Sequence, residues 1–234
     1  MNAKIATTHS NDLEALSADI LRMGGLVESM ISGACSAAAI VSIDAANAII
    51  ARDREVDALE ADIERRISTI LAVHQPVDLD LREVLAALKI SNDLERVGDL
   101  SKNIAKRTKQ LADSNVAYVL KGLQRMGTAA TTQLTDVLDA YRNRDADQAL
   151  SVWRGDEDID QFYNSYFQEI LTSMTEDPRT IVAGAHILFM AKNVERIGDH
   201  ATNIAELVYF SVTGEYLDGT KRPKADRIDV MVSR

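Results

Sequence analysis

Apolar residues in the first forty positions recur alternately at every third and fourth residue. They are Leu13, Leu16, Ile20, Met23, Val27, Met30, Ala34, Ala38 and Val41. This spacing places one continuous apolar stripe along the side of an α-helix. A second stripe follows Asp44, the expected N-cap residue, and comprises Ile49, Val56, Ile63, Ile67 and Ile70. The pattern predicts two long amphipathic helices.

The remaining chain shows the same kind of pattern. The string "HQP" at 74–76 ends the second helix, because the residue before a proline disfavours helical conformation. Four further helices are expected at about 78–111, 115–143, 146–175 and 179–212. No segment alternates with the period of two that is typical of a strand. The pattern therefore predicts an all-α fold of six long helices.

These helices repeat as a set of three. The strings "RMG", "DREVD" and "ERVGD", which begin at 22, 53 and 95, return as "RMG", "DEDID" and "ERIGD" at 125, 156 and 195. Pro76 likewise matches Pro178. Long helices with short connections pack as antiparallel bundles. We expect two tandem three-helix bundles with pseudo-twofold symmetry, at residues 8–112 and 115–213, and a loosely held tail at 214–234.

Charge and cysteine content narrow the function classes. The net charge of −10 argues against a nucleic-acid binder, which needs a basic face, and suits cations or basic partners. The single cysteine, Cys35, lies in an apolar helical run, so we expect a buried, unreactive thiol. No apolar run reaches the roughly 18–20 residues of a membrane span, and the start lacks the apolar core of a signal peptide. We expect a soluble cytoplasmic protein without membrane insertion.

The repeated ER[VI]GD string places polar oxygens opposite the apolar stripe of each third helix. Glu95, Asp99 and Asn103 step by four residues in the first copy. In the second copy the same places are taken by Glu195, Asp199 and Asn203. Each set forms a line of hard oxygen donors about 12 Å long.

The second helix of each unit adds two more carboxylates. Asp53 and Asp57 lie one turn apart in the first copy, and Asp156 and Asp160 do so in the second. If the second and third helices are neighbours, four carboxylates and an amide oxygen converge in each groove. Oxygen-only ligation suits Mg²⁺, Mn²⁺, Ca²⁺ or Fe better than Cu or a structural Zn. The alternative is a solvated acidic face whose arginines form weak surface pairs.

Three further features bear on the site. Gly98 and Gly198, kept in both copies despite a cost of about 1 kcal/mol inside a helix, predict close approach of a neighbouring helix backbone. His200 could add a ligand or a hydrogen bond in the second copy only. Phe162 and Tyr166 share a helix face and are expected in the core or at a dimer contact. No di-iron, Walker, nucleophile-elbow or dinucleotide motif is present, so no catalytic residue is expected.

The doubled unit, with "DREVD" and "QPVDLDLREVLAALKISNDLERVGD" in the first copy and "DEDID" and "ERIGDHATNIAE" in the second, resembles the PhoU family of bacterial phosphate-signalling regulators. The resemblance covers roughly residues 8–213. It implies a six-helix cytoplasmic protein, often a homodimer, that restrains the phosphate-starvation (Pho) response. The expected partners are the ATPase subunit of the phosphate ABC transporter and a sensor histidine kinase.

The resemblance also implies metal binding, because E/D-x-x-x-D motifs bind metal in some members of the family. In this sequence those motifs are Glu95 with Asp99, Glu195 with Asp199, Asp53 with Asp57 and Asp156 with Asp160. Two other readings stay open. One is a metal-dependent hydrolase of phosphate esters or polyphosphate, although no base, nucleophile or lid is evident. The other is a purely structural bundle whose acidic faces bind basic partner patches without metal.

Overall fold

The computed structural model describes residues 2–111, 117–155 and 157–217. Within these ranges the protein is helical and contains no strand. The α-helices are α1 (Asn2–Ala39), α2 (Ile43–His74), α3 (Asp78–Thr108), α4 (Ala117–Asn143), α5 (Ala146–Arg154), α6 (Glu157–Glu176) and α7 (Ile181–Thr213). Two single turns of 3₁₀-helix, η1 (Lys109–Leu111) and η2 (Pro178–Thr180), follow α3 and precede α7. All six expected helices are present, the fifth divided into α5 and α6 near Gly155.

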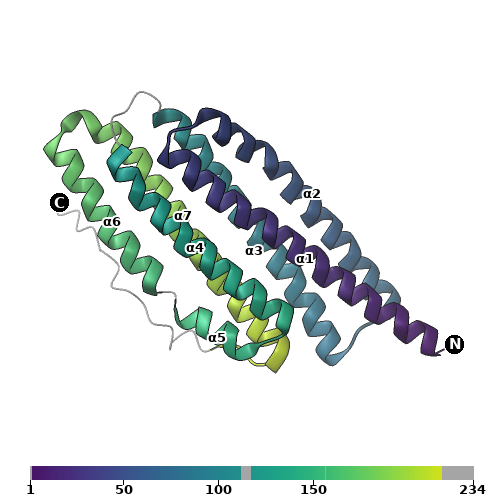
Figure 1. Ribbon diagram of the computed structural model, residues 1–234. Coiled ribbons are helices and arrows are strands. Elements are labelled where there is room, and N and C mark those ends of the chain that lie inside the picture. The colour runs from purple at the N-terminus through teal and green to yellow at the C-terminus, as the bar shows by residue number, and fades with distance from the viewer. Residues whose placement is uncertain (1, 112–116, 156, 218–234) are drawn as a thin grey trace, which may run out of the picture.

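The helices form a layered bundle (Figure 1). α1, α3, α4 and α7 make up its centre, where α1 packs on α4 and α3 packs on α7. α2 covers the outer side of α1 and α3, while α5 and α6 cover that of α4 and α7. The two three-helix units therefore lie side by side.

A single hydrophobic core runs through both units. Every member of the first predicted stripe except Val41 is buried, and so is every member of the second. Val41 is only half-buried and lies after α1 in the left-handed region, with φ of 51°. The units join because the core-facing stripes of α1 and α3 meet those of α4 and α7.

The start of α2 differs from expectation. The N-cap is Ser42, whose hydroxyl accepts a hydrogen bond from the backbone N–H of Ala45 at 3.3 Å. Asp44 instead lies in the first turn, where its negative charge interacts favourably with the positive end of the helix dipole. The prediction of Asp44 as the cap was wrong because both residue types are good caps and sequence spacing alone did not separate them.

The duplicated "RMG" glycines show the pseudo-twofold relation in the packing of α1 on α4. A Cβ on Gly24 would lie 2.5 Å from Leu138 Cδ1, and a Cβ on Gly127 would lie 2.5 Å from Cys35 Sγ. The two contacts are equivalent, since both partners are shifted by 103 residues. Cys35 is buried, and this burial raises the pKa of its thiol to about 12. The predicted burial of this cysteine is confirmed, and its lack of reactivity stays a prediction.

The two glycines of the ER[VI]GD strings have a different environment from the one expected. A Cβ on Gly98 would lie 3.3 Å from Val56 Cγ1, and one on Gly198 would lie 3.0 Å from Ile159 Cδ1. Neighbouring helices do approach closely, but with their side chains rather than with their backbones. The expected backbone contact was wrong in this respect.

Candidate acidic clusters

The first acidic cluster forms because α2 lies against α3. Lys102 bridges the two helices, with its Nζ 2.7 Å from Asp53 Oδ2 and 2.5 Å from Asp99 Oδ1. Burial lowers the pKa of Lys102, but the hydrogen bonds and charges of the two aspartates outweigh burial and raise that pKa above its ordinary value. One corner of the first cluster is therefore neutralised by a lysine of the chain itself.

The other corner of the first cluster holds carboxylates that crowd one another. Burial raises the pKa of Glu95, and the charges of Asp99 and Asp57 raise it further. Burial likewise raises the pKa of Glu60, followed by the charge of Glu95. The opposing cation is Arg96, whose side chain is 64% exposed and whose Nε lies 3.5 Å from Glu95 Oε2. This corner lacks a buried counter-ion among the described residues and can accept positive charge.

The second cluster lies between α6 and α7. Here the lysine pairs with the glutamate of the ER[VI]GD string rather than with its aspartate. Lys192 Nζ lies 2.6 Å from Glu195 Oε1 and 5.4 Å from the ring centre of Tyr163. Burial raises the pKa of Glu195, as do the charges of Asp199 and Asp160, while Lys192 lowers it. Glu195 Oε2 is buried and has no hydrogen-bond partner within the described chain. This orphaned oxygen is a candidate ligand atom.

The position equivalent to Lys102 in the second unit is Thr202. It is buried and donates a hydrogen bond to the Gly198 carbonyl at 3.1 Å. The two copies thus share the ER[VI]GD carboxylates but differ in their lysines: Lys102 is partly buried between α2 and α3, whereas Lys192 is exposed on α7. Asp156, the fourth predicted acid of this cluster, lies outside the described residues.

The two predicted asparagines do not join Glu95 and Glu195 in an obvious ligand set. Asn103 is exposed, and Asn203 lines an open depression between α3 and α7 that contains no other predicted ligand. Among the residues whose placement is described, no three histidine, cysteine, aspartate or glutamate side chains converge as a preformed metal site. The donor atoms suit a hard cation, but the side chains would have to rearrange to bind one.

Three residues of the clusters were missed by the sequence analysis: Glu60, Lys102 and Lys192. The spacing of each residue from a neighbouring acid could have identified it. Glu60 follows Asp57 by three residues, and both lysines lie three residues from an acid of the ER[VI]GD strings. Pairs at this spacing face each other on a helix. The sequence does not predict which carboxylate each lysine pairs with, because the pairing depends on how α2 and α6 are placed.

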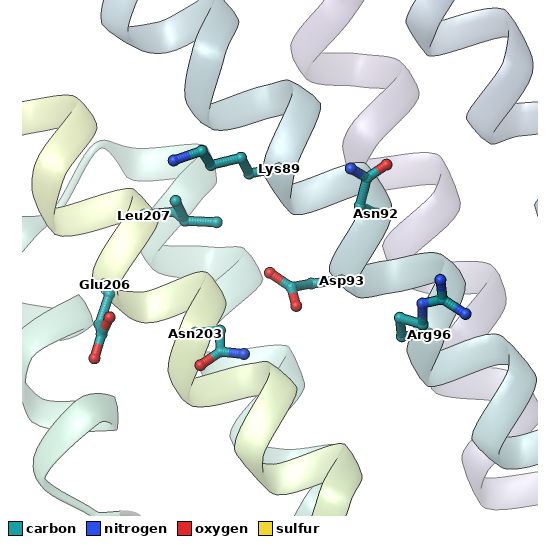
Figure 2. A pocket seen from close by; sticks show the side chains of 7 residues that line it. All are labelled: Lys89, Asn92, Asp93, Arg96, Asn203, Glu206 and Leu207. Atoms are coloured by element: carbon teal, nitrogen blue, oxygen red, sulfur yellow. The ribbon is translucent and has the colours of Figure 1, made fainter.

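The depression between α3 and α7 has a volume of about 410 Å³ (Figure 2). Its lining is mixed in charge and comprises Lys89, Asn92, Asp93, Arg96, Asn203, Glu206 and Leu207. Its carboxylates are engaged within the fold, since Asp93 Oδ1 lies 2.8 Å from His200 Nδ1 and Glu206 Oε1 accepts a hydrogen bond from Trp153 Nε1 at 2.8 Å. His200 therefore bonds to α3.

Comparison with known proteins identifies the family. The PhoU domain matches residues 20–108 and again 123–208, one match in each three-helix unit. The chain belongs to the PhoU family. It is 44% identical over 227 residues to the phosphate-specific transport system accessory protein PhoU homolog of Caulobacter vibrioides strain NA1000 / CB15N, covering 97% of this chain and 98% of that protein. The corresponding homolog of Rhizobium meliloti strain 1021 is 42% identical, with 99% and 98% covered.

Solved PhoU structures share the architecture. The crystal structure of PhoU from Pseudomonas aeruginosa has a TM-score of 0.84 at 35% identity, covering 88% of this chain and 99% of that one. The phosphate transport system regulatory protein PhoU from Streptococcus pneumoniae has a TM-score of 0.83 at 32% identity, with 90% and 99% covered. These structures confirm the predicted all-α fold class. None of the helices in the described ranges is long and apolar enough to cross a membrane.

Proposed function

We propose that this protein is a negative regulator of the phosphate-starvation response and of phosphate homeostasis. It acts in the cytoplasm, as a homodimer, as an adaptor between the ATPase subunit of the phosphate ABC transporter and a sensor histidine kinase. The observation that carries this proposal is the match over nearly the whole chain to relatives named as accessory proteins of the phosphate-specific transport system. The solved relative from Streptococcus pneumoniae is named a regulatory protein of that system.

We further propose that the acidic clusters bind Mg²⁺, Mn²⁺ or Fe ions. In the first cluster the carboxylates of Asp57, Glu60 and Glu95 would hold the cation, because their corner lacks the lysine that neutralises Asp53 and Asp99. A bound divalent ion would supply charge compensation and a link between α2 and α3. The raised pKa values of Glu60 and Glu95 support this assignment, since burial first, and then the charges of neighbouring carboxylates, disfavour the ionised forms that a cation would stabilise.

In the second cluster the cation would be held by the side chains of Glu195, Asp199 and Asp160. The support is the buried Oε2 of Glu195, which has no hydrogen-bond partner among the described residues, together with the mutual repulsion of these acids. Lys192 would then remain as an additional counter-ion of Glu195. Asp156 belongs to the same proposal by its place in the repeat.

The regulatory proposal is tested by depleting the protein in cells grown with ample phosphate and measuring alkaline phosphatase or another phosphate-starvation reporter. Depletion should raise the reporter, and the wild-type gene should restore repression. A variant with alanine at Glu95, Asp99, Glu195 and Asp199 then shows whether the clusters serve regulation. A reporter that stays silent on depletion contradicts the proposal.

The matched control removes four carboxylates outside the clusters. Glu14, Asp44, Asp147 and Glu176 are all exposed, so their alanine variant carries the same change in net charge. It should repress like the wild type and should bind as much metal. Metal content of the two purified variants separates loss of ligands from loss of charge. Equal metal content in both would refute the assignment of the clusters.

A metal-dependent hydrolase of phosphate esters or polyphosphate is the alternative function. Its chemistry would need a metal-activated water next to an acid or base. The relatives are named accessory or regulatory proteins, which is consistent with a non-enzymatic role. Phosphate release from polyphosphate by the purified, metal-loaded protein, lost in the cluster variant, would favour the alternative.

A further inference from the structure

α3 and α7 present a strip of positive charge on the outside of an acidic molecule. The two helices run antiparallel: Asp93 of α3 contacts His200 of α7, and Arg107, further along α3, contacts His186, which comes earlier on α7. We call the outward side chains of Lys89, Arg96, Arg107, Phe189 and Arg196 the α3–α7 strip. The strip is about 27 Å long, from the 18 residues between Lys89 and Arg107 at 1.5 Å each.

Three cations of the strip form few interactions with other described residues. Lys89 and Arg196 are exposed, and neither forms an ion pair or hydrogen bond with another residue that the structure describes. Arg96 is also exposed and makes only the long contacts of 3.5 Å to Glu95 and 3.9 Å to Asp99. The described residues therefore hold none of these three cations in a close ion pair.

Carboxylates also lie beside the strip: Glu95 and Asp99 contact Arg96, and Asp93 and Glu206 line the same depression as Lys89 and Arg96. Asp93 is held by His200, and Glu206 is held by the indole of Trp153. Both point into the junctions with neighbouring helices and are only partly exposed. Because Asp93 and Glu206 are partly buried, the most exposed charges along the strip are the cations Lys89, Arg96 and Arg196, although the chain carries a net charge of −10.

The arginine at the centre of the strip was retained in both copies of the repeat. Arg96 and Arg196 are the second residues of "ERVGD" and "ERIGD", and the pseudo-twofold relation places them on the same face. The lysines of the acidic clusters, by contrast, occupy different positions in the two copies. Arg96 forms only the two long contacts above and Arg196 forms no ion pair with another described residue, so little within the described fold requires an arginine at either place.

An exposed aromatic side chain lies at one end of the strip. Phe189 is 56% exposed, and the guanidinium carbon of Arg107 lies 4.2 Å from the centre of its ring. Val182, seven residues earlier on the same side of α7, is 71% exposed. An exposed aromatic residue next to arginine is the composition typical of a protein interface.

We propose that the α3–α7 strip is the docking surface for an acidic segment of a partner protein. Carboxylates of the segment would pair with Lys89, Arg96 and Arg196, and an apolar residue would pack on Phe189. This inference rests on the proposed function, because it assigns the adaptor a surface for one of its partners. Complementary charge also accelerates encounter between such partners.

A second copy of the chain is a poorer occupant. Two strips facing each other would bring Arg96 and Arg196 of both copies together. An acidic helix such as α2 of another copy could pair with the strip, but this contact joins unlike surfaces. Such heterologous contacts form rings or open filaments rather than a closed dimer.

The test measures binding of the purified full chain to the purified cytoplasmic part of the phosphate-sensing histidine kinase and to the transporter ATPase subunit. The variant Lys89→Glu/Arg196→Glu should bind one of them at least tenfold more weakly, with a weaker dependence on salt. The matched control is Arg54→Glu/Lys121→Glu, which reverses two exposed cations on other faces and should bind like the wild type. Lys89→Gln/Arg196→Gln should show an intermediate loss, and circular dichroism melts verify folding of each variant.

The outcomes distinguish failure of the proposed docking surface from failure of the proposed adaptor function. If the wild type binds neither partner, the proposed function fails and this inference fails with it. If the wild type binds and the strip variant binds equally well, only the docking surface is wrong. A third arm uses vesicles containing anionic phospholipid. Loss of vesicle binding in the strip variant, with partner binding unchanged, would assign the strip to a lipid surface and overturn the inference.

Discussion

Replacing Glu95 by glutamine should stabilise the metal-free protein. The substitution keeps the size of the side chain and removes one negative charge from a corner where Asp57, Glu60 and Asp99 repel it. Each such repulsion costs about 0.2–0.5 kcal/mol. The attraction lost is that of the exposed Arg96, worth at most about 0.5 kcal/mol. We expect a net gain of about 0.5–1 kcal/mol at pH 7.

The pH dependence provides a second readout of the same change. The pKa of Glu95 is raised in the folded state, so between its ordinary value and its folded value the folded protein binds more protons than the unfolded chain. The stability of the wild type therefore falls as pH rises through that window. In Glu95→Gln this contribution is absent, and the stability should change less over the same pH range.

Divalent cations should reverse the sign of the effect. A cation that binds the folded wild type at one hundred times its Kd adds about 2.7 kcal/mol to its stability. Glu95→Gln lacks one ligand oxygen and should gain less, so the wild type should become the more stable protein in Mg²⁺ or Mn²⁺.

The assay is thermal or urea unfolding in EDTA and in saturating metal. A difference of 1 kcal/mol corresponds to about 2–4 °C in Tm for a chain of this size. Glu55→Gln, an exposed change on the neighbouring helix α2, controls for net charge and should alter little. A Glu95→Gln protein that is less stable than the wild type in EDTA would refute the repulsion argument. A wild type whose Tm does not rise with metal would contradict the proposed metal site.

Three further predictions concern the rest of the fold. Lys102→Met should lower the free energy of unfolding by about 1–2 kcal/mol in urea, because it leaves Asp53 and Asp99, 13% and 33% exposed, without their cation; an unchanged urea midpoint would show that the two ion pairs contribute nothing. Tyr166→Phe removes a buried hydroxyl that donates to a backbone carbonyl of α4 at 2.7 Å, and should cost about 1 kcal/mol by the same assay; a neutral result would mean that water replaces the hydroxyl. Cys35 should resist a thiol reagent in the native protein and react only on unfolding, since burial raises its pKa to about 12; rapid native modification would show that α1 and α4 separate in solution.

The helical fold and the repeat were readable from the sequence. The three- and four-residue spacing of apolar residues such as Ile20 and Ile63 determines which side of each helix is buried, because that side alone can leave water at a gain in free energy. The repeated strings showed that one unit occurs twice. The carboxylates of ER[VI]GD also followed from spacing, since residues four apart share a helix face.

Tertiary structure decided how those faces are combined. Packing of α1 on α4 and of α3 on α7 joins the two predicted bundles in one core, and periodicity within a helix carries no information about its neighbour. The same packing brings Lys102 between Asp99 and Asp53, although Lys102 and Asp53 are 49 residues apart in sequence. In the second cluster the lysine is Lys192, which pairs with Glu195 instead. The packing also turns the arginines of the repeated string outward onto one face. Composition predicted an acidic protein, but only the placement of α3 beside α7 collected positive charge into a strip, because the sign of a surface depends on which helices share it.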